Sequence, residues 1–229
     1  MIFLITGTSR GIGRKIAEYY LNKNHTVIGC SRNPSDIEHS GYHHFELSIT
    51  DDDKVISLFR HIRSSFRGLD ILINNAGIAS MNHSLLTPMQ TVRNILETNV
   101  TANFLFSRES VKIMKKKKWG RIINFATFAV PFKLEGEAVY AASKAAVISM
   151  TEILSREYAE YGITVNAVAP PAVQTDLIKG VNQEKLNRLL KRQSISRYGT
   201  PEEVCNVIDF LIRPESEMVN GQVIYMGGV

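Results

Sequence analysis

Cysteine is scarce in this sequence of 229 residues. Cys30 and Cys205 lie far apart along the chain and form no metal-binding or redox motif. That scarcity excludes a disulfide-stapled secreted scaffold and a cysteine-based metal site. We therefore interpret both thiols as structural or incidental groups in a reducing cytosol, and we expect a cytoplasmic protein without a bound metal.

Long apolar runs and linker-like stretches are also missing. No segment approaches the roughly 18 uninterrupted apolar residues of a membrane span. The apolar run at residues 2–5 is too short for a signal peptide and has no basic leader, so we expect it to be a first strand. Because no Pro/Gly/Ser-rich linker or internal repeat divides the chain, we expect residues 1–229 to form a single domain.

Charge is only mildly unbalanced, with 27 basic and 22 acidic residues and a formal net charge of +5. This excess favours anionic small molecules and is compatible with an acidic partner. One dense basic cluster, residues 115–118, follows a predicted helix, where cations complement the negative end of the helix dipole. We therefore expect no nucleic-acid partner.

Strand-like and helix-like segments alternate along the chain. Apolar, partly β-branched runs predict strands at 2–6, 26–30, 44–47, 70–74, 121–125, 164–169 and 222–225. Helical spacing occurs between them, at 12–22, 52–66, 88–114 and 139–161. This alternation predicts an α/β fold of the Rossmann type, a doubly wound domain with a parallel sheet of about seven strands and helices on both faces.

The turn after the first predicted strand is rich in glycine. Residues 6–13 read Thr-Gly-Thr-Ser-Arg-Gly-Ile-Gly and open the first helix. Glycines at such a turn let the pyrophosphate of a dinucleotide approach backbone N–H groups at a helix N-terminus. A turn whose glycines serve helix packing is the alternative. The cofactor contacts expected here are Gly7, Ser9, Arg10, Gly11, Ile12 and Gly13.

This glycine pattern resembles that of the short-chain dehydrogenases/reductases, and further motifs follow in the family's order along nearly the whole chain. They are Asn74-Asn75-Ala76-Gly77, Asn99 in a helix, Tyr140-x3-Lys144 and Asn220-Gly221 before the last strand. The general pattern is most similar to the 3-oxoacyl-acyl-carrier-protein reductases and related carbonyl reductases. The resemblance implies a carbonyl or alcohol substrate, including an acyl-carrier-linked one, and places Asn75, Ala76 and Gly77 near the cofactor.

Tyr140 and Lys144 lie four residues apart, so a helix places them on one face. A lysine ammonium in that position stabilises a phenolate and is expected to lower the pKa of the tyrosine, which makes Tyr140 a workable acid/base. An ordinary helical pair is the alternative. The resemblance implies that Lys144 also binds the nicotinamide ribose and that Tyr140 lies at the cofactor.

Two further residues complete the catalytic set that the resemblance implies. Thr127 stands where the family usually has a serine, and it keeps a hydroxyl that can orient a substrate carbonyl. A threonine that caps a turn is the alternative. Asn99 would hold a water that links Lys144 to solvent, whereas a structural amide is equally compatible with the sequence.

After the sixth predicted strand the chain reads Pro170-Pro171 where the family has Pro-Gly. Proline fixes φ and removes an N–H, so the loop beside the nicotinamide must differ locally. Val173 and Thr175 still match cofactor-contacting positions. Residues 171–197 are expected to form a lid over the substrate pocket.

The second predicted strand ends Ser31-Arg32, without the carboxylate that an NAD site offers to the adenosine ribose. Arg32 and Arg10 suit a 2′-phosphate, because guanidinium groups bind phosphate through paired donors. Solvated surface arginines are the alternative. We expect NADP(H), with NAD(H) as the weaker candidate. Ser48 stands where the family often has an aspartate for the adenine amino group.

Two rival functions remain open. A catalytically silent dinucleotide sensor of the same fold is compatible with the departures at Thr127 and Pro171. A nucleotide-binding transferase, such as a methyltransferase, would leave Tyr-x3-Lys unexplained. By resemblance we also expect a homodimer or homotetramer, formed through the helices predicted at 88–114 and 139–161.

Overall fold

The computed structural model describes residues 1–173 and 183–228 of the chain. Its centre is a sheet of seven parallel strands in the order β3-β2-β1-β4-β5-β6-β7. The strands are β1 (Ile2–Thr6), β2 (Thr26–Ser31), β3 (Tyr42–Glu46), β4 (Ile71–Asn74), β5 (Gly120–Phe125), β6 (Ile163–Ala169) and β7 (Val223–Tyr225). The predicted doubly wound parallel sheet is therefore confirmed.

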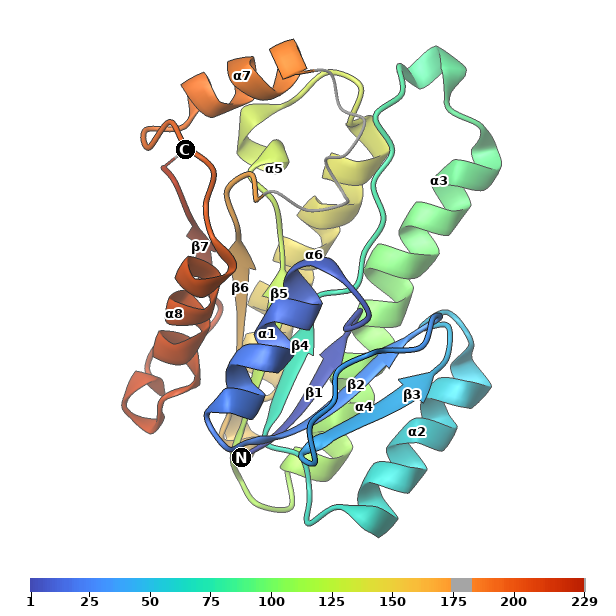
Figure 1. Ribbon diagram of the computed structural model, residues 1–229, viewed down its shortest axis with the longest axis vertical. Coiled ribbons are helices and arrows are strands. Elements are labelled where there is room, and N and C mark those ends of the chain that lie inside the picture. The colour runs from blue at the N-terminus through green and yellow to red at the C-terminus, as the bar shows by residue number, and fades with distance from the viewer. Residues whose placement is uncertain (174–182, 229) are drawn as a thin grey trace.

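Helices cover both faces of this sheet (Figure 1). One face carries α1 (Gly11–Asn22) and α8 (Pro201–Ile212), and the other carries α2 (Asp52–Ser65), α4 (Ala102–Met114) and α6 (Ala138–Glu157). Three shorter helices are α3 (Met89–Leu96), α5 (Ala129–Phe132) and α7 (Gln183–Arg192). Because successive strand residues point to opposite faces, Phe3 and Leu4 belong to different core clusters. Among the described residues, no helix is both long and apolar enough to cross a membrane.

Helix α8 was absent from the sequence-based assignment. Its signal is a capping box, in which the Thr200 side chain accepts from Glu203 N and the Glu203 side chain accepts from Thr200 N. Pro201 occupies the first turn, where its missing N–H costs nothing. Buried apolar side chains follow at helical spacing, so the start signal and the periodicity together could have located this helix.

The helix predicted at 88–114 is interrupted in the structure. Helices α3 and α4 are joined by a π-helical turn, Glu97–Thr101, and the buried Asn99 lies within it. Such turns insert a residue into an α-helix and re-aim the side chains that follow, and they occur often at functional sites. The other long prediction, 139–161, ends as a helix at Glu157 and continues as a 3₁₀ turn, Ala159–Tyr161.

A buried polar network fixes the packing of α4 and α6 on the sheet. Asn74 Nδ2 at the end of β4 donates to Ser107 Oγ on α4 (3.1 Å) and to Asn124 Oδ1 on β5 (2.9 Å). Asn124 Nδ2 then donates to Thr151 Oγ1 on α6 (2.9 Å), whose hydroxyl donates to the Val147 carbonyl (2.8 Å). Hydrogen bonds need fixed geometry, so this network sets the position of α6 more sharply than apolar contact does.

We expect Asn124→Ala to lower the free energy of unfolding by about 1–3 kcal/mol, because the variant leaves buried groups of Asn74 and Thr151 without their partner. Chemical denaturation monitored by circular dichroism measures this loss. Thr151→Ser, which keeps the hydroxyl, is the matched control and should lose less. An Asn124→Ala variant as stable as the parent would contradict the structural role of the network.

Candidate active site

The strand order reverses between β1 and β4, and a cavity of about 640 Å³ lies at the carboxyl ends of these strands. Eleven of the predicted cofactor residues line it together. They are Gly7, Ser9, Arg10, Gly11, Ile12, Gly13, Ser31, Arg32, Asn75, Ala76 and Gly77. The structure thus brings the glycine turn, the end of β2 and the end of β4 around one space.

The glycine turn lets an anion approach its backbone because Gly7, Gly11 and Gly13 carry no side chain. Gly7 and Gly11 have φ values of 78° and 63°, in the left-handed region that favours glycine. A Cβ at Gly13 would collide with Asn75 Nδ2 and the Gly7 carbonyl. Helix α1 follows directly, and its N-cap residue Arg10 makes no side-chain capping bond. The first amides of α1 therefore remain available to a phosphate.

Asn75 and Ala76 join the glycine turn to the end of β4. Their backbone N–H groups both donate to Thr6 Oγ1, at 3.1 and 3.0 Å. Asn75 Nδ2 donates to the Thr6 carbonyl at 2.9 Å. These bonds account for Asn75 and Ala76 as structural residues of the cavity wall as well as candidate cofactor contacts.

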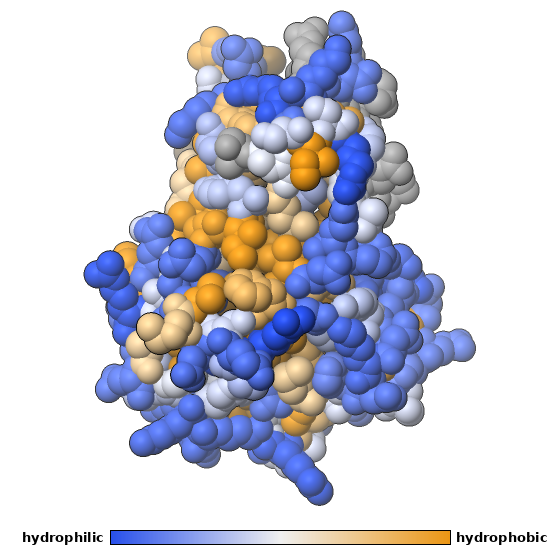
Figure 2. All heavy atoms as spheres, turned by 90° about the vertical axis from the view of Figure 1, so that its left-hand side faces the viewer, coloured by the Kyte–Doolittle hydropathy of each residue, from blue (hydrophilic) through white to orange (hydrophobic). Residues whose placement is uncertain are grey.

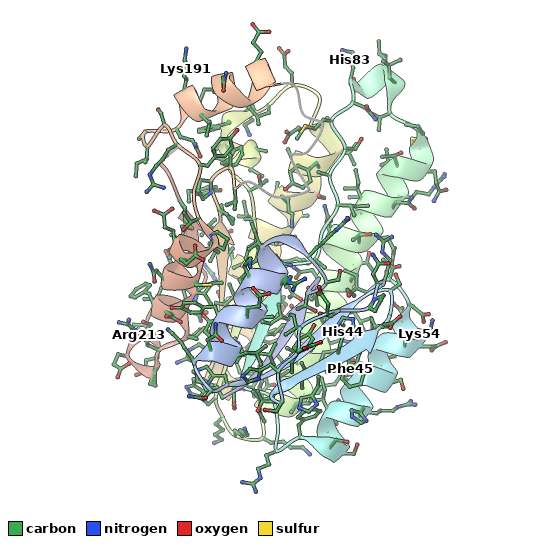
Figure 3. All side chains as sticks on the ribbon, viewed as in Figure 1. His44, Phe45, Lys54, His83, Lys191 and Arg213 are labelled. Atoms are coloured by element: carbon green, nitrogen blue, oxygen red, sulfur yellow. The ribbon has the colours of Figure 1, made fainter. Side chains whose placement is uncertain are left out.

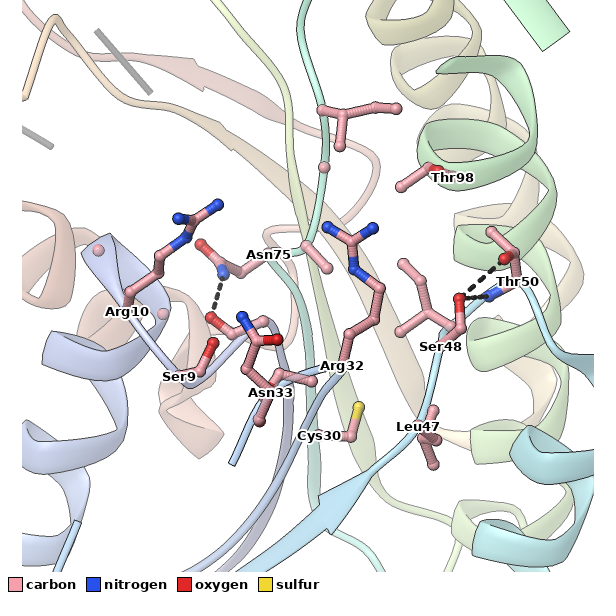
Figure 4. Close-up of a pocket in the computed structure, with 18 of the residues that line it drawn as sticks. Ser9, Arg10, Cys30, Arg32, Asn33, Leu47, Ser48, Thr50, Asn75 and Thr98 are labelled. Atoms are coloured by element: carbon pink, nitrogen blue, oxygen red, sulfur yellow. Dashed lines mark hydrogen bonds between the residues drawn. The ribbon is translucent and has the colours of Figure 1, made fainter. Parts of the chain in front are cut away.

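The end of the cavity at β2 is basic. Figure 4 shows the guanidinium groups of Arg10 and Arg32 extending from two separate loops toward the same open space. Ser31 is buried, and its Oγ donates to the Asn33 carbonyl at 2.7 Å. Ser48 also lines the cavity and lies 2.9 Å from Thr50 through their hydroxyl oxygens. Among the lining residues, Glu97 supplies a carboxylate, at the side of the cavity where α3 ends.

Tyr140 lies in the first turn of α6, beside Thr127. Burial raises the pKa of Tyr140 to about 12, and a hydrogen bond with the Thr127 side chain acts in the opposite direction. The sequence predicted that Lys144 would lower the pKa of Tyr140, whereas burial raises it. Thr127 Oγ1 also accepts from Ala129 N at 3.2 Å, so Thr127 both caps a turn and contacts the phenol.

Lys144 is 4% exposed, and its Nζ donates to the Phe125 carbonyl at 2.7 Å. Burial lowers the pKa of Lys144 to about 8. A Cβ built on Gly77 would lie 3.4 Å from Lys144 Nζ and 3.2 Å from Asn99 Oδ1. Gly77 lines the cavity, so the lysine and the asparagine reach the cavity wall at this glycine.

Asn99 uses its side chain to tie the loop after β4 to α6. Its Oδ1 accepts from Ile78 N at 2.9 Å, and its Nδ2 donates to the Ile78 carbonyl at 2.9 Å and to Ser143 Oγ at 3.0 Å. Ser143 Oγ in turn donates to the Tyr140 carbonyl at 2.7 Å. The Asn99 amide is thus fully engaged in these hydrogen bonds, and Ser143 connects it to the backbone of Tyr140.

Glu137 is a candidate site residue that the sequence analysis missed. It is 8% exposed at the N-cap of α6, and burial raises the pKa of its carboxyl group. Its negative charge also contributes to the raised pKa of Tyr140. The spacing of three residues before Tyr140 was the available signal, because residues at that spacing on a helix lie near each other.

The loop after β6 accommodates Pro171 through a glycine. A Cβ at Gly199 would collide with the Pro171 ring, and Gly199 N donates to the Ala172 carbonyl at 2.9 Å. Val173 is buried and forms a parallel bridge with Gly199, outside the lining of the cavity described above. Thr175 lies outside the described residues.

Of the expected lid, α7 is described, and it docks on α5. Arg192 Nη2 donates to the Phe132 carbonyl at 2.8 Å, and the guanidinium lies 5.0 Å from the centre of the Phe132 ring. These contacts join the end of α7 to α5, which lie next to each other (Figure 1).

The residues present fit a dinucleotide. A cavity floored by glycines at a helix N-terminus suits a pyrophosphate, and two arginines suit a further phosphate at the adenosine end. At the opposite wall, Gly77 lies beside the buried Lys144, and Tyr140, whose phenol can exchange a proton, lies one turn earlier on the same helix. The arrangement can support transfer of a hydride coupled to transfer of a proton.

Comparison with known proteins agrees with this geometry. The sequence model of short chain dehydrogenases matches residues 1–186. The 3-oxoacyl-acyl-carrier-protein reductase of Vibrio cholerae is 35% identical over 233 residues, which cover 99% of this chain and 96% of that protein. A 4-hydroxyisoleucine dehydrogenase complexed with NADH superimposes with a TM-score of 0.90 at 26% identity, over 99% of this chain and 97% of that one.

The protein ElxO with NADP bound also superimposes with a TM-score of 0.90, at 26% identity, over 98% of this chain and 96% of that one. Solved structures similar to this chain therefore include one with NADH and one with NADP. The family match covers well over half of the sequence, and the sequence relative is similar from end to end. This chain belongs to the short-chain dehydrogenase family of oxidoreductases.

Proposed function

We propose that this protein is an NADP(H)-dependent oxidoreductase that interconverts a carbonyl and an alcohol, with Tyr140 as the general acid/base. The observation that carries the proposal is the hydrogen-bonded pair of Tyr140 and Thr127 at the start of α6. One turn further along this helix, Lys144 lies with Asn99 beside Gly77, which lines the cavity. NADPH, when bound, supplies the hydride. Carbonyl reduction then needs a proton donor for the developing alkoxide.

Tyr140 is the group that supplies this proton. A phenol with a pKa of about 12 is fully protonated at neutral pH, which suits the direction of reduction. The hydroxyl of Thr127 contacts the phenol and can orient a substrate oxygen beside it. Lys144 holds a cation at the cavity wall, where it can bind ribose hydroxyls and stabilise the phenolate left after proton transfer.

Assembly and location follow as secondary proposals. We propose a homo-oligomer of single-domain subunits in the cytoplasm. Phe104 on α4 and Ile153 on α6 are 43% and 53% exposed, on the helices expected to form an interface. Apolar side chains also gather on the side of the molecule where β7 and α8 lie (Figure 2), and there Phe210 is 43% exposed.

An acyl-carrier-linked carbonyl is among the proposed substrates, since the Vibrio cholerae relative is a reductase of that kind.

A screen of NADPH oxidation over β-ketoacyl thioesters, ketones, quinones and keto-sugars tests the activity. We expect Tyr140→Phe to lower kcat by about two to four orders of magnitude on any substrate found, because one positioned proton donor contributes about that much. NADPH binding and thermal stability should stay near those of the parent. Substantial activity in the Tyr140→Phe variant would eliminate this tyrosine as the donor, and binding without any turnover would favour a dinucleotide sensor.

We expect the parent to bind NADPH at least about tenfold more tightly than NADH, since a charge-assisted contact to phosphate is worth roughly 1.5–3 kcal/mol. Arg32→Ala should weaken NADPH and leave NADH nearly unchanged, and Ser31→Asp should shift preference toward NADH. Fluorescence titration at two salt concentrations measures both cofactors, and the preference should shrink at high salt. Arg67→Ala, another exposed arginine, is the control. Equal dissociation constants in the parent would refute the NADPH assignment.

The pH dependence of alcohol oxidation tests Glu137. Oxidation needs the phenolate of Tyr140, so its rate should rise as pH increases toward the pKa of about 12. The charge of Glu137 raises that pKa, so Glu137→Gln should lower it and move the rising limb of the rate profile to lower pH. Glu135→Gln, at an exposed position two residues earlier, is the control and should leave the profile in place. An unshifted profile for Glu137→Gln would separate this carboxylate from the proton transfer.

A further inference from the structure

A histidine of the neighbouring strand contacts both residues that flank Arg32. His44 lies on β3 (Figure 3), and its Nε2 is 3.0 Å from the Asn33 carbonyl oxygen and 3.2 Å from Ser31 Oγ. A carbonyl oxygen can only accept, so Nε2 carries the hydrogen and donates to it. Ser31 Oγ donates to the same carbonyl at 2.7 Å. Two donors therefore converge on one backbone oxygen beside Arg32.

The same histidine is connected to the glycine turn. His44 Nδ1 lies 2.8 Å from Tyr42 Oη, which lies 2.8 Å from Thr8 Oγ1. Thr8 is fully buried within the turn. A continuous series of polar contacts thus runs from Thr8 through Tyr42 and His44 to Ser31 and Asn33. It links the pyrophosphate end of the cavity to its adenosine end.

Gly29 makes this connection sterically possible. Tyr42 and Thr8 meet across β2 at this residue, and a Cβ there would collide with Thr8 Oγ1 and with the Tyr42 hydroxyl. β2 and β3 are in register, with Gly29 beside His44, so Ser31 lies two residues further along the same face of β2. The position of the histidine is therefore set by the pairing of β2 with β3 and by the absence of a side chain at Gly29.

We propose that His44 is a positioning residue for cofactor choice, which holds the Ser31–Asn33 turn so that Arg32 faces the adenosine 2′-phosphate of NADPH. The inference rests on the proposed NADP(H) function and extends it to a residue that does not line the cavity. Without this anchor Arg32 would have to be ordered when the cofactor binds, and ordering a side chain or loop subtracts from affinity. NADH lacks the 2′-phosphate, so its binding does not depend on Arg32.

Dissociation constants of NADPH and NADH for His44→Ala, His44→Gln and the parent test the proposal. We expect His44→Ala to weaken NADPH about fivefold, the equivalent of one hydrogen bond, and to change NADH less than about twofold. His44→Gln should recover most of the loss, because its amide N–H can donate to the Asn33 carbonyl. The kcat with saturating NADPH should be unchanged, since no contact joins His44 to Tyr140 among the hydrogen bonds of the described residues.

His43→Ala is the matched control, because His43 is the exposed neighbour on β3 and packs against Phe66 instead. Tyr42→Phe provides a second variant should His44→Ala fold poorly, and it should weaken NADPH selectively but less. The proposal would be overturned if His44→Ala left the ratio of the NADPH and NADH dissociation constants unchanged, whether or not both cofactors bound more weakly. A parent that binds both cofactors equally would refute the NADPH assignment by itself, while His44 would still be judged by whether its variants alter the ratio.

Discussion

The amide and hydroxyl network from Asn74 through Asn124 to Thr151 is the interaction on which the site depends. It lies in the layer between the sheet and α6, where apolar contact alone would tolerate small slides of the helix. Tyr140 and Lys144 occupy the N-terminal part of that helix, beyond the last contact of the network. Fixing the helix at Thr151 therefore fixes the distance between its N-terminal end and the edge of the sheet.

The cavity itself is built from close approach of backbone segments. Thr6 lies at the end of β1 and accepts two N–H groups from the loop after β4, and Asn75 returns a bond to the Thr6 carbonyl. These bonds hold the loop after β4 against the end of β1. The loop after β4 therefore supports the glycine turn. At the end of the cavity near β2, the His44 side chain from β3 supports the turn instead.

Much of this arrangement could be predicted from the sequence, because periodicity and glycine spacing are local signals. All seven strands were located within about two residues, and the glycine turn was placed at the correct end of β1. The π-helical turn at Asn99 could not be predicted, since a helix with one inserted residue keeps nearly the same apolar pattern. The direction of the Tyr140 pKa was also missed. A sequence shows that a lysine lies one turn away, but the extent of burial and the carbonyl that the ammonium binds belong to tertiary structure.

The two cysteines lie on opposite faces of the sheet, Cys30 in the core under α2 and α4 and Cys205 in the core under α1 and α8. Both are buried, and burial raises the pKa of each thiol to about 12. Thiolate, the reactive form, is therefore nearly absent at neutral pH, and neither sulfur can reach the other through the intervening strands. Alkylation of Cys205 consequently reports how often the layer of α1 and α8 opens, whereas Cys30 also lines the candidate cavity and reports access through it. Mass spectrometry of the two modified peptides would compare these two routes of exposure within one protein.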